Sequence, residues 1–359
     1  MPGTKTDWLM SAPVSATNAK ADTALFPFLM KLIRGENLTQ NEAADFYTAL
    51  TAGDANPAQM AAALTALTAK GETAEELAGM AGVMRGQALV IKSPRTAVDI
   101  AGTGSSTAKT FNVSTAAAIV AAGAGLTIAK QCNRGVTTKV GSADVLGELG
   151  VKIAGEPPVA QASLSSGLAF LFAPKFHPNL RRVGDLRRSL GIRTCLNILG
   201  LLANPAGVSR QLIGVWHRSL IEPTAKALSL LKTDLAWIVH GSDGFDEITL
   251  TGETFVAAVK GAEVRPYVVS PADFGLKPAK IDHLTVKTAK ESAAIITEVL
   301  SGKRRDEARS LVVLNAAAAL IVGGLATEPM HAARLAEQSI DSGMAQNKLE
   351  RLIQFTSRK

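Results

Sequence analysis

The chain has 359 residues, of which 47% are hydrophobic but only 4% aromatic, and its formal net charge is +7. This length allows one large enzyme or two modest domains, and a composition rich in Ala and Gly is typical of a helical or α/β protein. The positive charge permits a nucleic-acid role, but a highly anionic small substrate explains it equally well. Because aromatic residues for base stacking are scarce, we do not expect nucleic acid as a partner.

Cysteine use and hydropathy narrow the class further. Cys132 and Cys195 provide neither a disulfide framework nor a metal-binding spacing. Residues 1–22 lack the apolar core of a signal peptide and are interpreted as a loose N-terminal extension. The apolar residues 310–326 are interrupted by Asn315 and two glycines, which favours a buried helix over a membrane span. We therefore expect a cytoplasmic protein without a membrane segment.

The pattern from Leu25 to Leu89 is helical. Thr39 and Thr73 are each followed three residues later by Glu, which is the signature of a capping box at a helix start. Apolar residues recur at helical spacing between these starts. We expect a four-helix unit that forms a helical domain over residues 23–92, with an α/β domain over residues 97–359.

A strand, a glycine loop and a helix are predicted next. The apolar run Ala97–Ile100 precedes Gly102 and Gly104, and an Ala-rich helical segment follows. Such a loop presents free backbone N–H groups at a helix N-terminus, where phosphate fits. The alternative is that the glycines serve only the geometry of the turn. Hydroxyl groups that are available in this loop come from Thr103, Ser105, Ser106, Thr107, Thr110, Ser114 and Thr115.

A second polar loop is expected after the apolar run Leu126–Ala129. It begins with Lys130 and includes Asn133, Arg134, Thr137 and Thr138. Two such loops at the ends of successive strands form one crevice, which is where open α/β sheets bind ligands. A solvated loop with a few charges is the alternative.

The expected helix from Pro178 to Leu190 carries an inward-facing arginine. At 100° per residue, with Val183 at zero, Arg187 lies at about 40°, inside the arc of the apolar residues, whereas Arg181 and Arg188 point away. An arginine on the buried face either extends its charged end out to water or needs an anion. The anion would be a structural salt-bridge partner or a carboxylate that the arginine binds in bidentate fashion.

The rest of the chain alternates between strands and helices, which favours parallel pairing. Asp246 and Glu247 follow the expected strand Leu235–Val239 in a Gly/Asp loop. They are interpreted either as a surface turn or as hard oxygen ligands for Mg²⁺. From Thr249 onward we expect a hairpin and then helices, without identifiable chemistry.

These stretches resemble the anthranilate phosphoribosyltransferase family over most of the chain from about Phe26. The residues that carry the resemblance are Gly102-Thr103-Gly104, Thr110-Phe-Asn-Val-Ser-Thr115, Lys130-Gln-Cys-Asn-Arg134, GSADVLGELG, FLFAPKFHP, LRRSLGIRT and HGSDGFDEI. The resemblance implies a small all-helical domain, joined by the helices of residues 175–205, and a larger α/β domain with a mainly parallel central sheet. It also implies a ligand crevice between the two domains and a homodimer formed through the helical domain.

The activity that the resemblance implies is Mg²⁺-dependent transfer of the phosphoribosyl group from phosphoribosyl pyrophosphate (PRPP) to anthranilate in tryptophan biosynthesis. Lys130 and Arg187 would be the catalytic residues, and Ser114, Asp246 and Glu247 the metal ligands. The residues implied for anthranilate are Gly102, Asn133, His177 and Arg187, with His177 lining the pocket rather than acting as a base. The residues implied for PRPP are Gly102, Thr103, Gly104, Thr110, Asn112, Ser114, Thr115, Lys130, Thr137 and Thr138.

Three departures from the family pattern leave alternatives open. The family's Gly-Gly-Asp-Gly stands here as residues 104–107 with two serines and a threonine, its His-Gly as Gln131-Cys132, and its paired serines as threonines. A different aromatic acceptor is one alternative, and a non-enzymatic, nucleic-acid-binding paralogue is another. The combination of Asp246, Glu247, Lys130, Asn133 and Arg187 argues against the second alternative.

Overall fold

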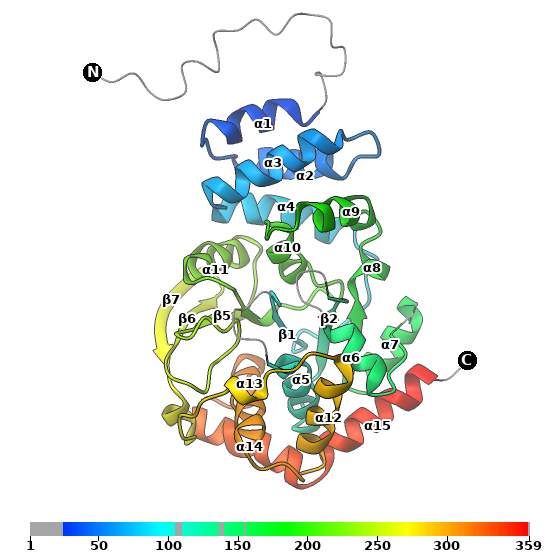
Figure 1. The fold of residues 1–359 in the computed structure, drawn as a ribbon, viewed down its shortest axis with the longest axis vertical. Coiled ribbons are helices and arrows are strands. Elements are labelled where there is room, and N and C mark those ends of the chain that lie inside the picture. The colour runs from blue at the N-terminus through cyan, green and yellow to red at the C-terminus, as the bar shows by residue number, and fades with distance from the viewer. Residues whose placement is uncertain (1–23, 105–109, 136–139, 154–155, 358–359) are drawn as a thin grey trace, which may run out of the picture.

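The computed structural model describes residues 24–357 apart from 105–109, 136–139 and 154–155 (Figure 1). The N-terminal part consists of helices α1 (Phe26–Ile33), α2 (Gln40–Thr51), α3 (Pro57–Lys70) and α4 (Ala74–Gly86). The capping boxes at Thr39 and Thr73 are both present, because each hydroxyl accepts from the backbone N–H of the glutamate three residues on. The four helices expected in this region are therefore all found.

Within the described residues, seven strands form one sheet in the order β3-β2-β1-β4-β5-β6-β7. The strands are β1 (Val98–Gly102), β2 (Ile128–Cys132), β3 (Leu168–Phe172), β4 (Arg210–Gly214), β5 (Leu235–Gly241), β6 (Thr254–Lys260) and β7 (Glu263–Val269). The first five in this order pair in parallel, and β6 and β7 form an antiparallel hairpin at one edge. The prediction of a mainly parallel sheet is confirmed.

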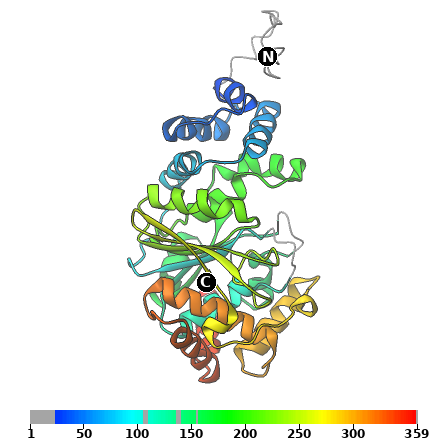
Figure 2. The same cartoon turned by 90° about the vertical axis from the view of Figure 1, so that its left-hand side faces the viewer.

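Helices cover both faces of this sheet. The helices that follow α4 along the chain are α5 (Val113–Gly123), α6 (Ser142–Glu148), α7 (Pro157–Ser165), α8 (Ala173–Phe176), α9 (Leu180–Leu190), α10 (Leu196–Leu202), α11 (Ile221–Leu230), α12 (Ala289–Leu300), α13 (Glu307–Gly323), α14 (Pro329–Asp341) and α15 (Met344–Ser357). Short 3₁₀ helices lie at Arg218–Leu220, Pro271–Phe274 and Asp282–Leu284. Figure 2 shows α11 over one face and the C-terminal helices under the other.

The strands divide their side chains between two large cores. Ile100, Leu212 and Val239 point to the core that contains α5 and α13. Ile213 and Ile238, one residue out of step with these, point to a core shared with α11, α10 and all four N-terminal helices. The N-terminal helices therefore pack against the sheet half of the molecule through α9, α10 and α11.

Several element boundaries differ from the expected ones. The second strand spans Ile128–Cys132, so Lys130 lies within a strand and not in the loop after it. Pairing decides this boundary, because Lys130 stands opposite Phe170 and Cys132 opposite Phe172 in the ladder with β3. Likewise Gly102 ends β1 rather than lying in the loop, and α9 begins at Leu180 rather than at Pro178.

Residues 310–323 of the apolar run 310–326 lie in α13, which packs between α5 and α14, and the helix ends at Gly323. The expected buried helix is therefore present. Among the helices of the described residues, none has the length and apolarity needed to cross a bilayer.

Candidate active site

A cavity of ≈ 530 Å³ opens at the carboxyl ends of the central strands, below α9 and α10. One part of its wall is polar and comes from β1, β2, the start of α5 and the loops after β1, β2 and β5: Gly102, Thr103, Gly104, Thr110, Asn112, Ser114, Lys130, Asn133, Arg134, Asp246 and Glu247. The other part is mainly apolar and comes from α8, α9 and α10: Ala173, Leu180, Arg187, Leu196, Asn197, Gly200 and Leu201. The cavity therefore has an anion-binding half and a half suited to an apolar ring.

The carboxylate of Asp246 holds the glycine loop. It accepts hydrogen bonds from the backbone N–H of Gly104 (2.7 Å) and the hydroxyl of Thr103 (2.8 Å). Its backbone crosses the ends of β1 and β4 so closely that a Cβ on Gly214 would lie 1.6 Å from the Asp246 carbonyl oxygen, and one on Gly102 2.9 Å. Glycine at these two paired positions is therefore required for the close approach of the acidic loop.

Glu247 and Lys130 meet at the N-terminus of α5. The Glu247 carboxylate accepts from the backbone N–H of Ser114 at 3.1 Å, and the Lys130 Nζ lies 3.3 Å from the Ser114 hydroxyl and donates to the Ile100 carbonyl. Burial raises the pKa of Glu247, and the neighbouring Asp246 raises it further. Burial lowers the pKa of Lys130, an effect that the charges of Asp99 and Glu247 oppose. This end of the cavity thus concentrates fixed charges out of water, where they interact strongly with a charged ligand.

Arg187 stands in the other half of the cavity. Burial lowers the pKa of its guanidinium group, and it has no ion pair or hydrogen bond with any of the described residues. Its neighbour Arg188 is exposed and pairs with Asp185 on the same helix. The predicted arc is confirmed, because Arg187 shares the inner face of α9 with the fully buried Val183. A partly dehydrated cation without a counter-ion favours an incoming carboxylate.

Most of the candidate residues converge on this cavity. Gly102, Thr103, Gly104, Thr110, Asn112, Ser114, Lys130, Asn133, Arg187, Asp246 and Glu247 all line it. Thr137 and Thr138 lie outside the described residues.

Two candidates are not part of the cavity wall. Thr115 is fully buried, and its hydroxyl has no partner within the described part of the chain. His177 is 3% exposed, one ring N–H donates to the Ala203 carbonyl, and burial lowers its pKa to about 4. In this structure both side chains lie beside the cavity instead of lining it, because Thr115 points into the α5 core and His177 ends α8 on its buried side.

The structure also brings residues to the site that sequence patterns missed. Thr285, Val286 and Lys287 line the polar half, although they lie far along the chain in the link before α12. The backbone N–H of Phe111 donates to the Leu284 carbonyl at 3.2 Å and thereby attaches this link to the start of α5. No motif marks these residues, so only the tertiary contact identifies them.

The donor set around Ser114 fits a hard divalent cation. Asp246 and Glu247 provide adjacent carboxylates and Ser114 a hydroxyl, which are the oxygen ligands that Mg²⁺ takes, and a cation between the acids would relieve their repulsion.

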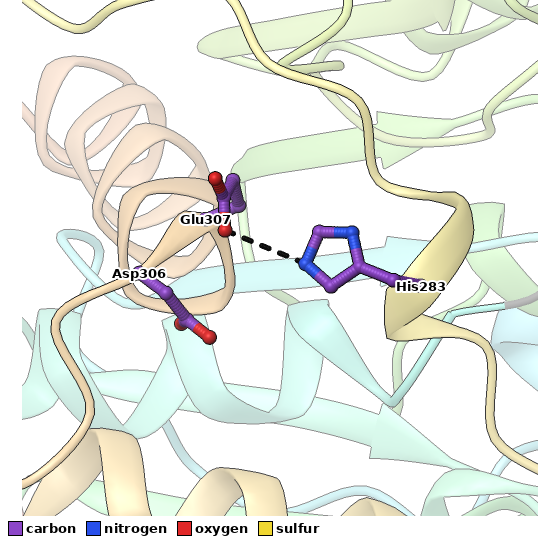
Figure 3. A group of neighbouring side chains, drawn as sticks. All are labelled: His283, Asp306 and Glu307. Atoms are coloured by element: carbon purple, nitrogen blue, oxygen red, sulfur yellow. Dashed lines mark ion pairs between the residues drawn. The ribbon is translucent and has the colours of Figure 1, made fainter.

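A second group of possible ligands, His283, Asp306 and Glu307, lies on the surface (Figure 3). There, however, His283 pairs with Glu307, while Asp306 caps α13 through the Ala308 N–H and pairs with Arg304 at 2.8 Å. These partners account for the group as a surface ion-pair cluster.

Two family models match the chain. The helical bundle domain of a glycosyl transferase family matches residues 26–88, and the a/b domain of that family matches residues 94–346. The two-part fold is accordingly that of this class of glycosyl transferases.

Individual relatives narrow the class. Anthranilate phosphoribosyltransferase from Rhodopseudomonas palustris is 44% identical over 326 residues, which cover 90% of this chain and 96% of that protein. The crystal structure of anthranilate phosphoribosyltransferase from Thermus thermophilus is 36% identical, with a TM-score of 0.86 over 92% of this chain and 99% of that one. The Saccharomyces cerevisiae enzyme in complex with PRPP and Mg is 29% identical, with a TM-score of 0.84 over 93% and 98% of the two chains. The chain belongs to the anthranilate phosphoribosyltransferase family.

Proposed function

We propose that this protein transfers the phosphoribosyl group of PRPP to the amine of anthranilate in tryptophan biosynthesis. The products are N-(5-phosphoribosyl)anthranilate and pyrophosphate. The observation that carries this proposal is the two-sided cavity, in which the unpaired, partly dehydrated Arg187 lines the apolar half and Lys130 with the acid pair lines the polar half. Such a cavity suits a substrate pair of an aromatic carboxylate and a polyphosphate ester.

The chemistry needs a leaving group to be stabilised and an amine to be placed. The bond between ribose C1 and the pyrophosphate oxygen breaks, and its electron pair stays on pyrophosphate. The anthranilate nitrogen bonds to C1 and gives up a proton to solvent. Lys130 offsets the charge that develops on pyrophosphate. Arg187 holds the anthranilate carboxylate, with Asn133 beside it, so that the amine faces C1. No strong base is required, because the aromatic amine already carries a lone pair.

We also propose that Ser114, Asp246 and Glu247 hold Mg²⁺. When bound, the ion neutralises phosphate charge on PRPP and on the departing pyrophosphate. Yeast enzyme structures of this family were determined with PRPP and Mg and, separately, with 4-fluoroanthranilate, which supports both the metal and the substrate pair.

Loss of anthranilate fluorescence on mixing protein, PRPP and Mg²⁺ tests this function. We expect the signal loss to require all three components. In Arg187→Ala, the KM for anthranilate should rise at least about 100-fold while the KM for PRPP changes little, since a charge-assisted bidentate contact is removed. Arg188→Ala is the matched control on the same helix. Equal behaviour of the two variants would contradict the role of Arg187, and an inactive wild-type protein would contradict the function.

The remaining expectations concern the architecture. We propose that the helical part consists of residues 23–92 with the helices of 175–205, and the α/β part of the rest of residues 97–359. The two parts contact the substrates from opposite sides. We place the protein in the cytoplasm.

We also propose a homodimer through the helical part, where the exposed Phe26 and Ile33 lie on α1. Sedimentation of the wild type and of Ile33→Asp tests the dimer: the variant should sediment as a monomer, and an unchanged mass would contradict this interface.

A further inference from the structure

Strand β2 sends consecutive side chains to opposite faces of the sheet. Ile128 and Cys132 belong to the core that contains α5, and Lys130, in step with them, reaches Ser114 on that side. Gln131 therefore points to the other face, together with Ala129. A Cβ placed on Gly200 of α10 would lie 3.7 Å from the Gln131 Nε2, which puts this amide in the half of the cavity that contains Arg187.

The Gln131 side chain is buried, and its carbonyl oxygen has no hydrogen-bond partner in the described part of the chain. Only 9% of the residue is exposed, and it lines the cavity. A buried amide without a partner costs free energy that a ligand group can recover. The two ends of an amide are similar in size, so rotation of the terminal group can present either the donor or the acceptor to a ligand.

The backbone of Gln131 is held firmly in place. Its N–H donates to the Asp99 carboxylate at 3.2 Å, and that carboxylate also accepts from Asn204 Nδ2 at 2.7 Å. Asn204 in turn donates to the Ala129 carbonyl at 2.8 Å. Both oxygens of the buried Asp99 carboxylate therefore accept hydrogen bonds, and the Gln131 backbone is fixed. A side chain that discriminates between ligands needs such a fixed backbone position.

We propose that Gln131 determines acceptor specificity by hydrogen bonding to a hydroxyl group on the aromatic ring of the acceptor. The inference rests on the proposed function, in which Arg187 fixes the acceptor carboxylate and thereby the position of the ring. A hydroxyl both donates and accepts, so it satisfies whichever end of the amide faces the cavity. Leu180, Leu196 and Leu201 on this side are apolar. The amide that α10 adds to the lining, Asn197, already accepts from the Thr194 N–H through its Oδ1 at 3.1 Å.

The test compares anthranilate with its ring-hydroxylated isomers in the wild type and in Gln131→Met. Methionine keeps the length and volume of glutamine but removes both hydrogen-bonding ends. For the best hydroxylated isomer we expect the ratio of its kcat/KM to that of anthranilate to fall at least about tenfold in Gln131→Met, while kcat/KM for anthranilate changes less than about threefold. Gln338→Met, an exposed change on α14, is the control and should leave the ratio unchanged.

The possible outcomes distinguish the role of Gln131 from the proposed transferase function. A ratio that stays the same in Gln131→Met, or a parallel loss for both acceptors, overturns the role of Gln131 while the wild type still uses anthranilate. A wild-type protein that turns over neither anthranilate nor its hydroxylated isomers contradicts the proposed function. The role of Gln131 is then also contradicted, because it rests on that function.

Discussion

At the scale of single residues, the buried histidine makes stability depend on pH. Burial lowers the pKa of His177 to about 4 from an ordinary value of 6.5. As the pH falls below 6.5, the histidine is protonated in the unfolded chain but stays neutral in the folded protein. The free energy of unfolding therefore decreases until the pH reaches the folded pKa of about 4. The contribution of His177 to the free energy of unfolding is therefore complete above about pH 6.5 and is lost as the pH falls towards about 4.

We expect His177→Gln to show a weaker pH dependence than the wild type. Between about pH 7.5 and about pH 5, the free energy of unfolding of the wild type should fall by about 2 kcal/mol more than that of the variant. Urea unfolding at the two pH values measures this difference. Parallel losses in the two proteins would show that His177 is not the titrating group.

Gly214 offers a second test at this scale. Alanine at this position would place a Cβ 1.6 Å from the Asp246 carbonyl oxygen, so the acidic loop would have to shift. We expect Gly214→Ala to raise the Mg²⁺ concentration for half-maximal activity at least about tenfold and to cost about 1–3 kcal/mol of stability. Gly147→Ala, where a Cβ meets nothing within 4 Å, is the control. An unchanged Mg²⁺ dependence in Gly214→Ala would contradict the link between this glycine and the acid pair.

At the scale of elements, helices α2 and α4 pack unusually close together. A Cβ on Gly79 of α4 would lie 2.1 Å from the Gln40 carbonyl oxygen at the start of α2, whereas one on Gly82, a turn further along, would meet nothing within 4 Å. The same helix thus contains one glycine that packing requires and one that it does not.

We expect opposite effects from alanine at these two glycines. Gly82→Ala should stabilise the protein by about 0.5–1 kcal/mol, because alanine has the higher helix propensity. Gly79→Ala should destabilise it by about 1–3 kcal/mol, since the two helices would have to separate. Thermal unfolding of both variants is the measurement, and a stabilised Gly79→Ala would show that the close approach is not needed.

At the scale of the whole molecule, the N-terminal helices do not have a core of their own. Their buried residues, such as Phe46 and Leu64, share one cluster with Leu199 of α10 and Ile238 of β5. Arg85 of α4 also donates to the Leu202 carbonyl at 2.7 Å. The helical part is therefore completed by segments that lie more than a hundred residues away.

We expect a fragment of residues 24–92 not to fold by itself. Without α9, α10 and α11, much of its apolar surface would face water, and a unit of this size has little stability to lose. Circular dichroism during urea titration should show no cooperative transition for the fragment but a clear one for the full chain. A cooperative transition in the fragment would show that its own contacts suffice.

Local chemistry in the sequence determined much of this protein. Capping boxes defined the starts of α2 and α4, alternating strands and helices predicted the parallel sheet, and helical spacing placed Arg187 on the buried face of α9. These predictions succeeded because they depend on neighbours within a few residues. The glycine loop, Lys130 and the Asp246-Glu247 pair were found through a family resemblance as well as through local pattern.

Only the tertiary structure decided which of these residues meet. The ladder with β3 placed Lys130 inside a strand, the packing of α5 and α8 kept Thr115 and His177 out of the cavity wall, and a distant link brought Lys287 into it. The direction of the Gln131 amide, opposite to Lys130, also follows from the sheet. These features depend on contacts between segments far apart in the chain, which no local spacing encodes.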